Sequence, residues 1–148
     1  MKKALLFSGF FLLAVTAMSN ANAAAETAAD VIKVETPEVR MVSPDATAAE
    51  SFMTLENTGT QSHKLVGASS PIDTNTLLHK DVVIDGQTTM VPVKEITIPA
   101  KGSTELSFSS LHVMLIGLDK PLPNNSIVPI KLIFDDGSEL AISAKAVS

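Results

Sequence analysis

The chain has 148 residues, no cysteine, no tryptophan and no tyrosine, and a formal net charge of −5 at pH 7. Without cysteine it has no thiolate nucleophile, no cysteine-based zinc site and no cysteine ligand for a blue-copper centre. An acidic chain without a basic stripe is a poor binder of nucleic acid, so we expect no nucleic-acid partner.

Residues 1–23 have the pattern of a secretory signal peptide. Two lysines near the start precede an apolar run (4–15), and Ala21-Asn22-Ala23 supplies a small-x-small cleavage site. We expect cleavage after Ala23, export to the periplasm and no membrane anchor afterwards; an uncleaved N-terminal anchor is the alternative. Residues 24–30 are small and polar and predict a flexible leader, which precedes a single domain at 31–148.

The remainder of the chain predicts short β-strands, because its apolar residues recur with a period near two. Asn57-Thr58-Gly59 is a turn signal, and Asp-Gly pairs at 85–86 and 136–137 lie between extended apolar runs, which is the strongest short hairpin signal. The predicted strands include 52–55, 64–68, 77–84, 91–98, 104–108, 111–118, 127–134 and 139–143. Proline and glycine leave no room for a long helix, so the pattern predicts an antiparallel β-sandwich or small barrel.

Histidine and methionine are the only imidazole and sulfur ligands in this chain. A two-residue loop at Asp85-Gly86 pairs Asp81 with Met90, which makes His79 and Met90 diagonal neighbours on one face of the hairpin. His112 and Met114 are two residues apart in another extended run, so they also share a face. The alternate positions are apolar and should face the core, so we expect the four candidate ligands in an accessible site outside it.

Two imidazoles and two thioethers favour copper(I), because thioethers are soft ligands, whereas copper(II) prefers nitrogen and oxygen. Zinc usually takes cysteine, histidine or carboxylate. Copper(I) held by such a site has no acid–base task to perform, so the residues favour an ion carrier and not an enzyme. The alternative is a structural or interaction β-sandwich module without metal, in which the methionines fill the core. An electron-transfer cupredoxin is disfavoured by the missing cysteine.

The order His79, ten residues, Met90, twenty-one residues, His112-x-Met114 resembles the motif of periplasmic copper chaperones of the PCuAC type. Further similar segments are Leu65–Pro71, Val91-Pro92-Val93, Ile98-Pro99-Ala100 and His112–Leu118, and the similarity covers residues 31–147. The resemblance implies a cupredoxin-like or immunoglobulin-like antiparallel β-sandwich with a copper(I) site at His79, Met90, His112 and Met114. It also implies copper delivery toward cytochrome oxidase, alone or with a thiol-bearing chaperone; general copper scavenging is the alternative role.

Two departures from that family narrow the prediction. Many relatives carry extra methionines between the first histidine and the distal methionine, whereas residues 80–89 contain none. Many also have a tail rich in histidine and methionine, whereas this sequence stops at Ser148 without one. We therefore expect one copper(I) per chain and no strong tail site for copper(II). Separately, we expect the protein to be a monomer.

Four other positions have simpler interpretations. His63 follows polar residues and is predicted to be a solvated loop residue. Met53 shares a face with Leu55 in a predicted strand and is expected in the core. Gly67 and Gly117 are predicted to allow the backbone conformations that bulges or turns require.

Overall fold

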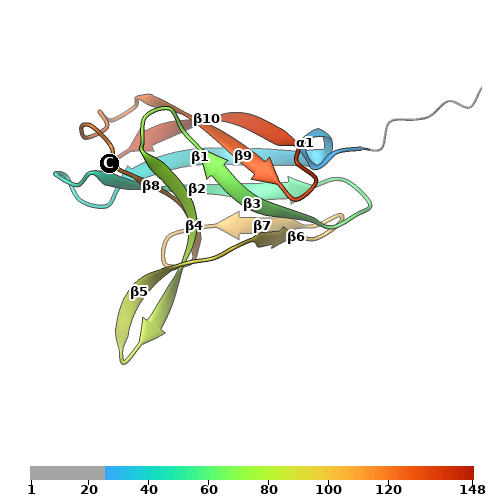
Figure 1. Ribbon diagram of the computed structural model, residues 1–148, viewed down its shortest axis with the longest axis horizontal. Helices are drawn as coiled ribbons and strands as arrows, with labels where there is room; N and C mark the ends of the chain where they lie inside the picture. Colours follow the sequence, from blue (N-terminus) through green and yellow to red (C-terminus); the bar gives the residue numbers. More distant parts are fainter. Residues whose placement is uncertain (1–25) are drawn as a thin grey trace, which may run out of the picture.

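The computed structural model describes residues 26–148, so the predicted signal peptide (1–23) and the start of the predicted leader lie outside the described residues. This part contains one short helix followed by ten strands (Figure 1). The elements are α1 (Ala28–Val31), β1 (Ile32–Met41), β2 (Ala48–Asn57), β3 (His63–Ser69), β4 (Asn75–Ile84), β5 (Gln87–Pro92), β6 (Ile96–Ile98), β7 (Ser103–Leu106), β8 (Leu111–Ile116), β9 (Ile127–Phe134) and β10 (Glu139–Val147). No helix in this region is long and apolar enough to cross a membrane.

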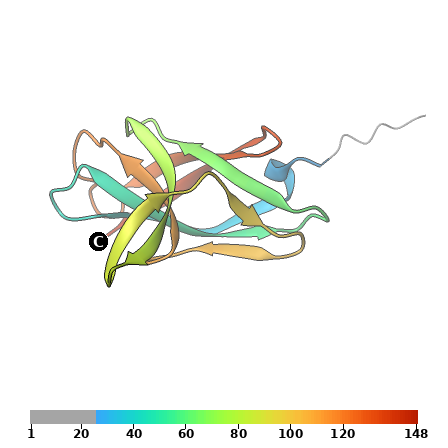
Figure 2. The ribbon, with the colours of Figure 1, turned by 60° about the horizontal axis from the view of Figure 1, so that its bottom comes forward.

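The strands lie in the order β5-β4-β8-β2-β1-β10-β9-β3-β6, and β7 pairs with β2 beside β8. Every pair is antiparallel except β1 with β10. Figures 1 and 2 show the strands folded into two layers. The structure confirms an all-β sandwich and adds one parallel pair to the predicted antiparallel arrangement.

The core lies between the layers and is built from alternating positions. Along β9, every second side chain from Val128 to Phe134 is buried, as expected for strands with one face inward. Leu55, Leu65, Val113 and Ile130 come from four different strands and belong to one buried cluster. Met53 is buried in β2, as predicted.

Both Asp-Gly hairpins form where the sequence predicts them. The Asp85-Gly86 loop joins β4 to β5, with Ile84 opposite Gln87. Its two loop residues have positive φ, 51° and 77°, as a type I′ turn requires. The predicted strand 91–98 is instead two strands, because the chain leaves the β4 edge after Pro92 and joins β3 as β6.

The N-terminal segment also differs from the prediction. From Ala28 onward the predicted leader forms α1, and the backbone N–H groups of Ala28 and Ala29 donate to Asp136 and Ser138 in the β9–β10 turn. These partners are 108 and 109 residues away in the chain. Their distance along the sequence explains why local composition predicts a flexible segment there.

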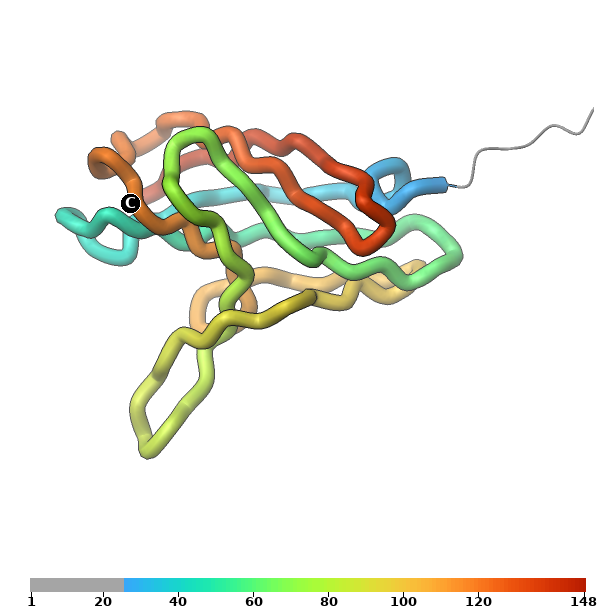
Figure 3. Tube along the Cα trace, in the orientation of Figure 1, coloured from blue at the N-terminus to red at the C-terminus, as the bar shows by residue number. Residues whose placement is uncertain are grey.

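The β4–β5 hairpin projects from the sandwich. Residues 75–80 of β4 pair with β8, whereas the rest of β4 pairs only with β5 (Figures 1 and 3). We call residues 81–91 the arm. Val83 and Ile84, near its tip, are exposed. The sequence predicts that the apolar face of the hairpin packs on the core, but at Ile84 this face extends past the edge of the core.

Candidate metal centre

The strand register gathers the four predicted ligands on one face of three adjacent strands. Across the β4–β5 hairpin, His79 lies opposite Pro92 and Asp81 opposite Met90, which is the predicted register. Across β4 and β8, His79 lies directly opposite His112, and Leu77 lies opposite Met114. Met90 and Met114 are therefore the diagonal neighbours of His79 on its two sides.

The two imidazoles meet at the centre of this arrangement. The His79 and His112 ring centroids are 5.7 Å apart, and their planes are nearly perpendicular at 87°. On the far side of His112, the Phe52 ring of β2 packs edge-on with a centroid separation of 6.3 Å. His112 is thus held between an aromatic side chain and the second imidazole.

Burial of the four side chains is uneven, which corrects the expectation of an accessible site. His112 is 1% exposed and Met114 is 8% exposed, whereas Met90 is 39% exposed. The reason is that β2 continues the sheet beyond β8 and places Glu50 opposite Met114 and Phe52 beside His112. The centre therefore has a closed side formed by β8 and β2 and an open side formed by β5.

Two imidazole nitrogens at this centre are buried without a hydrogen-bond partner in the described chain, His79 Nδ1 and His112 Nε2. The other nitrogen of His112, Nδ1, is 3.1 Å from the Ser110 carbonyl oxygen. A carbonyl only accepts, so Nδ1 carries the proton and donates it. Nε2 of the neutral ring then keeps a free lone pair. A buried polar atom left unpaired costs free energy, and a bound metal ion would remove that cost.

Burial keeps His79 in the form that binds metal. Desolvation and the neighbouring His112 lower the pKa of His79 below its ordinary value of 6.5, against the smaller opposing effect of Asp81. A lower pKa favours the neutral ring. The His79 ring is therefore prepared as a neutral nitrogen donor.

A buried carboxyl group lies beside the imidazoles. Glu50 is 6% exposed, and its Oε1 is 3.8 Å from His112 Nε2, which is too long for a hydrogen bond. Burial raises the pKa of Glu50, while His112 and Arg40 act in the opposite direction. Glu50 was not predicted from the sequence, because its position at the centre depends on the pairing of β2 with β8.

The donor set fits a soft ion better than a hard one. Within residues 26–148, no group of three or more histidine and acidic side chains is arranged to hold a metal. Nitrogen donors at this centre come from two imidazoles, and the sulfur donors on the same face are the thioethers of Met90 and Met114. The carboxyl groups of Asp81, opposite Met90, and Glu50, opposite Met114, also lie on this face. Thioethers prefer copper(I) over magnesium, calcium or zinc.

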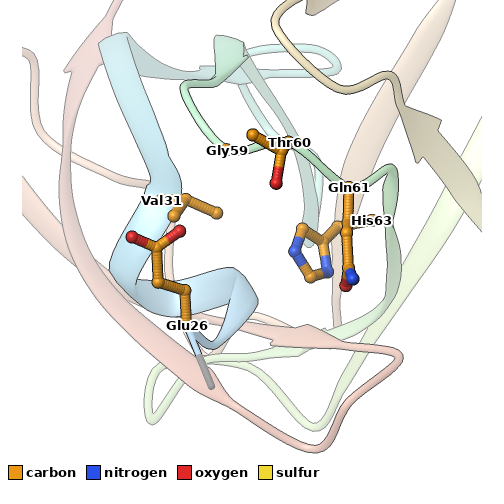
Figure 4. A pocket seen from close by; sticks show the side chains of 6 residues that line it. All are labelled: Glu26, Val31, Gly59, Thr60, Gln61 and His63. Atoms are coloured by element: carbon orange, nitrogen blue, oxygen red, sulfur yellow. The ribbon is translucent and has the colours of Figure 1, made fainter. Parts of the chain in front are cut away.

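His63 lies away from this centre and is not the solvated loop residue that the sequence predicts. It begins β3, is buried, and its Nδ1 is 3.6 Å from Asp135 Oδ1. A small pocket separates it from Glu26 and Val31 (Figure 4). The short helix α1 covers this end of the sandwich, which is why a polar turn becomes partly enclosed.

Comparison with known proteins places the chain in a family. Residues 32–146 match the family model described as "Putative lipoprotein LpqE-like". The protein named "Putative lipoprotein Lxx21020", from Leifsonia xyli subsp. xyli, is 34% identical over 111 residues, which is 74% of this chain. The chain spans 66% of the length of that relative.

Solved structures share the fold. "Solution structure of CuI-DR1885 from Deinococcus Radiodurans" is 34% identical, with a TM-score of 0.61 over 84% of this chain and 85% of that one. The apo form of DR1885 is 32% identical, with a TM-score of 0.61 over 99% and 97% of the two chains. "Copper-bound PCuAC domain from PmoF2" is 22% identical, with a TM-score of 0.65 over 79% and 92%. The predicted cupredoxin-like β-sandwich is thereby confirmed.

Proposed function

The chain belongs to the LpqE-like family, and we propose that it is a copper(I) carrier that binds one ion through His79, Met90, His112 and Met114. The observation that carries this proposal is the strand register, which brings two imidazoles opposite each other and flanks them with two thioethers. The similar protein CuI-DR1885, which is 34% identical, is named as a copper(I) form, and this supports the choice of ion.

In this function copper(I) is cargo. The proposed ligands His112 and Met114 are buried on β8, between β4 and β2, and would hold the ion in place. Met90 lies on the exposed edge strand and leaves the ion reachable from solvent. A centre that is closed on one side and open on the other suits an ion that must be retained and then released.

The resemblance to PCuAC chaperones supports a specific setting for this carrier. We assign the mature protein to the periplasm after signal-peptide cleavage, and we assign delivery toward the copper centres of cytochrome oxidase, alone or with a thiol-bearing chaperone. General copper scavenging predicts retention of the ion without transfer to such a partner, so a transfer assay with a purified acceptor separates the two roles.

Copper(I) titration against a chromophoric chelator tests the binding site. We expect the protein to retain about one equivalent of copper(I), and both Met90→Leu and Met114→Leu to weaken retention while keeping the fold, because leucine nearly conserves the side-chain volume. We expect the larger loss for Met114→Leu, since the buried Met114 is held in place. Met53→Leu is the matched control, because Met53 is buried in the core of β2.

The site assignment is wrong if the double variant of Met90 and Met114 binds copper(I) as tightly as Met53→Leu. X-ray absorption on the loaded protein gives an independent count, for which we expect two sulfur and two nitrogen neighbours. A protein that retains no copper(I) against the chelator would contradict the carrier function and favour a metal-free interaction module.

A further inference from the structure

The open side of the metal centre is bordered by the free edge of β5. This strand is the first in the sheet order, so its only strand partner in the described residues is β4. Exposed edge strands usually carry charges or bulges that block pairing with another chain. The β5 sequence, Gln87–Pro92, has neither a charged residue nor a register shift against β4.

The register shows which backbone groups of β5 are free. A two-residue loop closes on a hydrogen-bonded pair, here Ile84 with Gln87, and hydrogen-bonded and non-hydrogen-bonded pairs then alternate. Thr88 and Met90 are therefore in non-hydrogen-bonded pairs, and their N–H and C=O groups point away from β4. The N–H of Asp81, opposite Met90, accordingly donates to Ser110 and not to β5.

Met90 therefore presents two kinds of group at one position. Its thioether lies on the ligand face, and its backbone N–H and C=O face the free edge. Two residues farther on, Pro92 has no N–H to offer, and in the other direction the chain turns at Gly86. The edge therefore accepts only a short strand, centred on Thr88 and Met90.

Charge at the two ends of this edge sets the chemistry of a partner. The exposed Asp85 lies at the tip of the arm, and the exposed Lys94 follows the other end of the strand. Between them the edge is neutral, and Val83, opposite Thr88, is 72% exposed. An antiparallel strand that begins with an acidic residue and ends with a basic residue would complement both ends.

We propose that the free edge of β5 docks an extended segment of the copper-exchange partner, which pairs with Thr88 and Met90 and carries a cysteine or methionine opposite Met90. This role rests on the copper-carrier function proposed above. Directly opposite residues in an antiparallel pair share a face, with Cβ atoms about 4.5–5.5 Å apart. The sulfur of the partner therefore arrives on the ligand face beside the Met90 thioether.

Strand pairing makes the transfer a ligand exchange. A bond from copper to the sulfur of the partner forms as the bond to Met90 Sδ breaks, and the remaining ligands of the chain follow. A partner cysteine enters as thiolate and releases its proton to water, and copper stays in the copper(I) state throughout. Because the edge is short, the paired strand also leaves readily once the ion has moved.

The test compares Thr88→Pro with Thr88→Ala. Proline removes the outward N–H without breaking the β4–β5 hydrogen bonds and is tolerated on an edge strand, whereas alanine removes the same side chain and keeps the N–H. The probe is the synthetic peptide acetyl-Glu-Val-Thr-Cys-Thr-Val-Lys-amide, and dithiothreitol is the small-thiol comparison. We expect Thr88→Pro to slow copper(I) transfer to the peptide roughly five- to tenfold, from the loss of one hydrogen bond, with no change in transfer to dithiothreitol.

Equal transfer to the peptide from both variants would overturn the docking edge. A titration of the metal-free protein with the serine version of the peptide, followed by NMR, tests docking without copper. We expect shifts at Thr88 and Met90 that Thr88→Pro abolishes, even if copper(I) binding itself fails. A concentration-dependent dimer that only Thr88→Pro disrupts would instead assign this edge to a second copy of the chain and overturn the heterologous partner.

Discussion

The two histidines of the candidate metal centre are held in different ways. The tautomer of His112 is fixed by its hydrogen bond to the Ser110 carbonyl, and the ring is enclosed by Phe52 and His79. His79 lies on the side nearer the arm, and its Nδ1 is buried without a partner in the described residues. The protonation of His79 is therefore set mainly by desolvation and by its charged neighbours.

We predict that an NMR titration of the metal-free protein gives His79 a pKa below 6.5, because burial and His112 both lower it. The unfolded chain then binds this proton more readily than the folded chain. The folded state consequently loses stability as the pH falls below 6.5 toward the lowered pKa. Copper(I) retention should therefore persist below pH 6.5 and decline only as the pH passes below the lowered pKa of His79.

Asp81→Asn is the control for this pH dependence. Asp81 raises the pKa of His79, so its neutralisation should lower the pKa further and extend copper(I) retention to more acidic solutions. A His79 pKa at or above 6.5, or a rise in the Asp81→Asn variant, would contradict this account of the site.

At the scale of single elements, strand β8 depends on the glycine that follows its last residue. It carries His112 and Met114 and is followed by Gly117, which has φ +80°. A Cβ at Gly117 would collide with the side chain of Thr74, whose N–H and hydroxyl both donate to the Ile116 carbonyl. Glycine is therefore required here both by the backbone conformation and by the close approach of the loop before β4.

We predict that Gly117→Ala lowers the free energy of unfolding by about 2–4 kcal/mol, from left-handed strain together with overpacking. Gly86→Ala is the matched comparison, because Gly86 has φ +77° and nothing lies near its added Cβ. It should cost only about 1 kcal/mol, from backbone strain alone. Urea denaturation measures both, and equal losses would show that the contact with Thr74 contributes nothing.

The hairpins were predictable from the sequence because their signals are local. Asp85-Gly86 fixes both the turn and the register, so the diagonal placement of His79 and Met90 follows from short-range rules. Gly67 was predicted to mark a bulge, and the register of β3 against β9 shifts between Leu65 and Gly67. The ligand role of the four residues remains a prediction.

The missed features depend on contacts between distant parts of the chain. Burial of His112 requires β2 to pair with β8, and the exposure of the arm requires β4 to run past the end of β8. Neither the β2–β8 pairing nor the point at which β4 runs past β8 has a signature in the sequence of a single strand. His63 was misjudged for the same reason, because α1 and Asp135 reach it from other parts of the sequence.

At the scale of the whole molecule, α1 lies at one end of the sandwich, and the β4–β5 hairpin leaves the sandwich nearer the other end (Figures 1 and 3). The hydrogen bonds from α1 to the β9–β10 turn attach the start of the described chain to a hairpin near its end. Val31 also packs against Gly59, where an added Cβ would lie 3.1 Å from the Val31 side chain. The N-terminal segment is therefore part of the folded domain, although its composition predicts a leader.

We predict that Asp136→Ala releases α1 and lowers stability. Burial opposes ionisation of Asp136, but hydrogen bonds from Ser138 and the Ala28 N–H, together with His63, lower its pKa below 3.8. A carboxyl group with a lowered pKa stabilises the fold above its unfolded value, and this contribution is lost as the pH falls through the folded value. Because Asp136 is exposed, solvent screening limits the expected loss to about 1 kcal/mol at pH 7. The difference from wild type should shrink by pH 3.

Urea denaturation at both pH values measures this contribution, with Asp119→Ala as the control because Asp119 is an exposed loop residue. Faster proteolysis between α1 and β1 in Asp136→Ala, with unchanged copper(I) retention, would show that the contact fastens the N-terminus without shaping the metal centre. If Asp136→Ala is as stable and protease-resistant as Asp119→Ala, α1 is held by the packing of Val31 and not by this carboxylate.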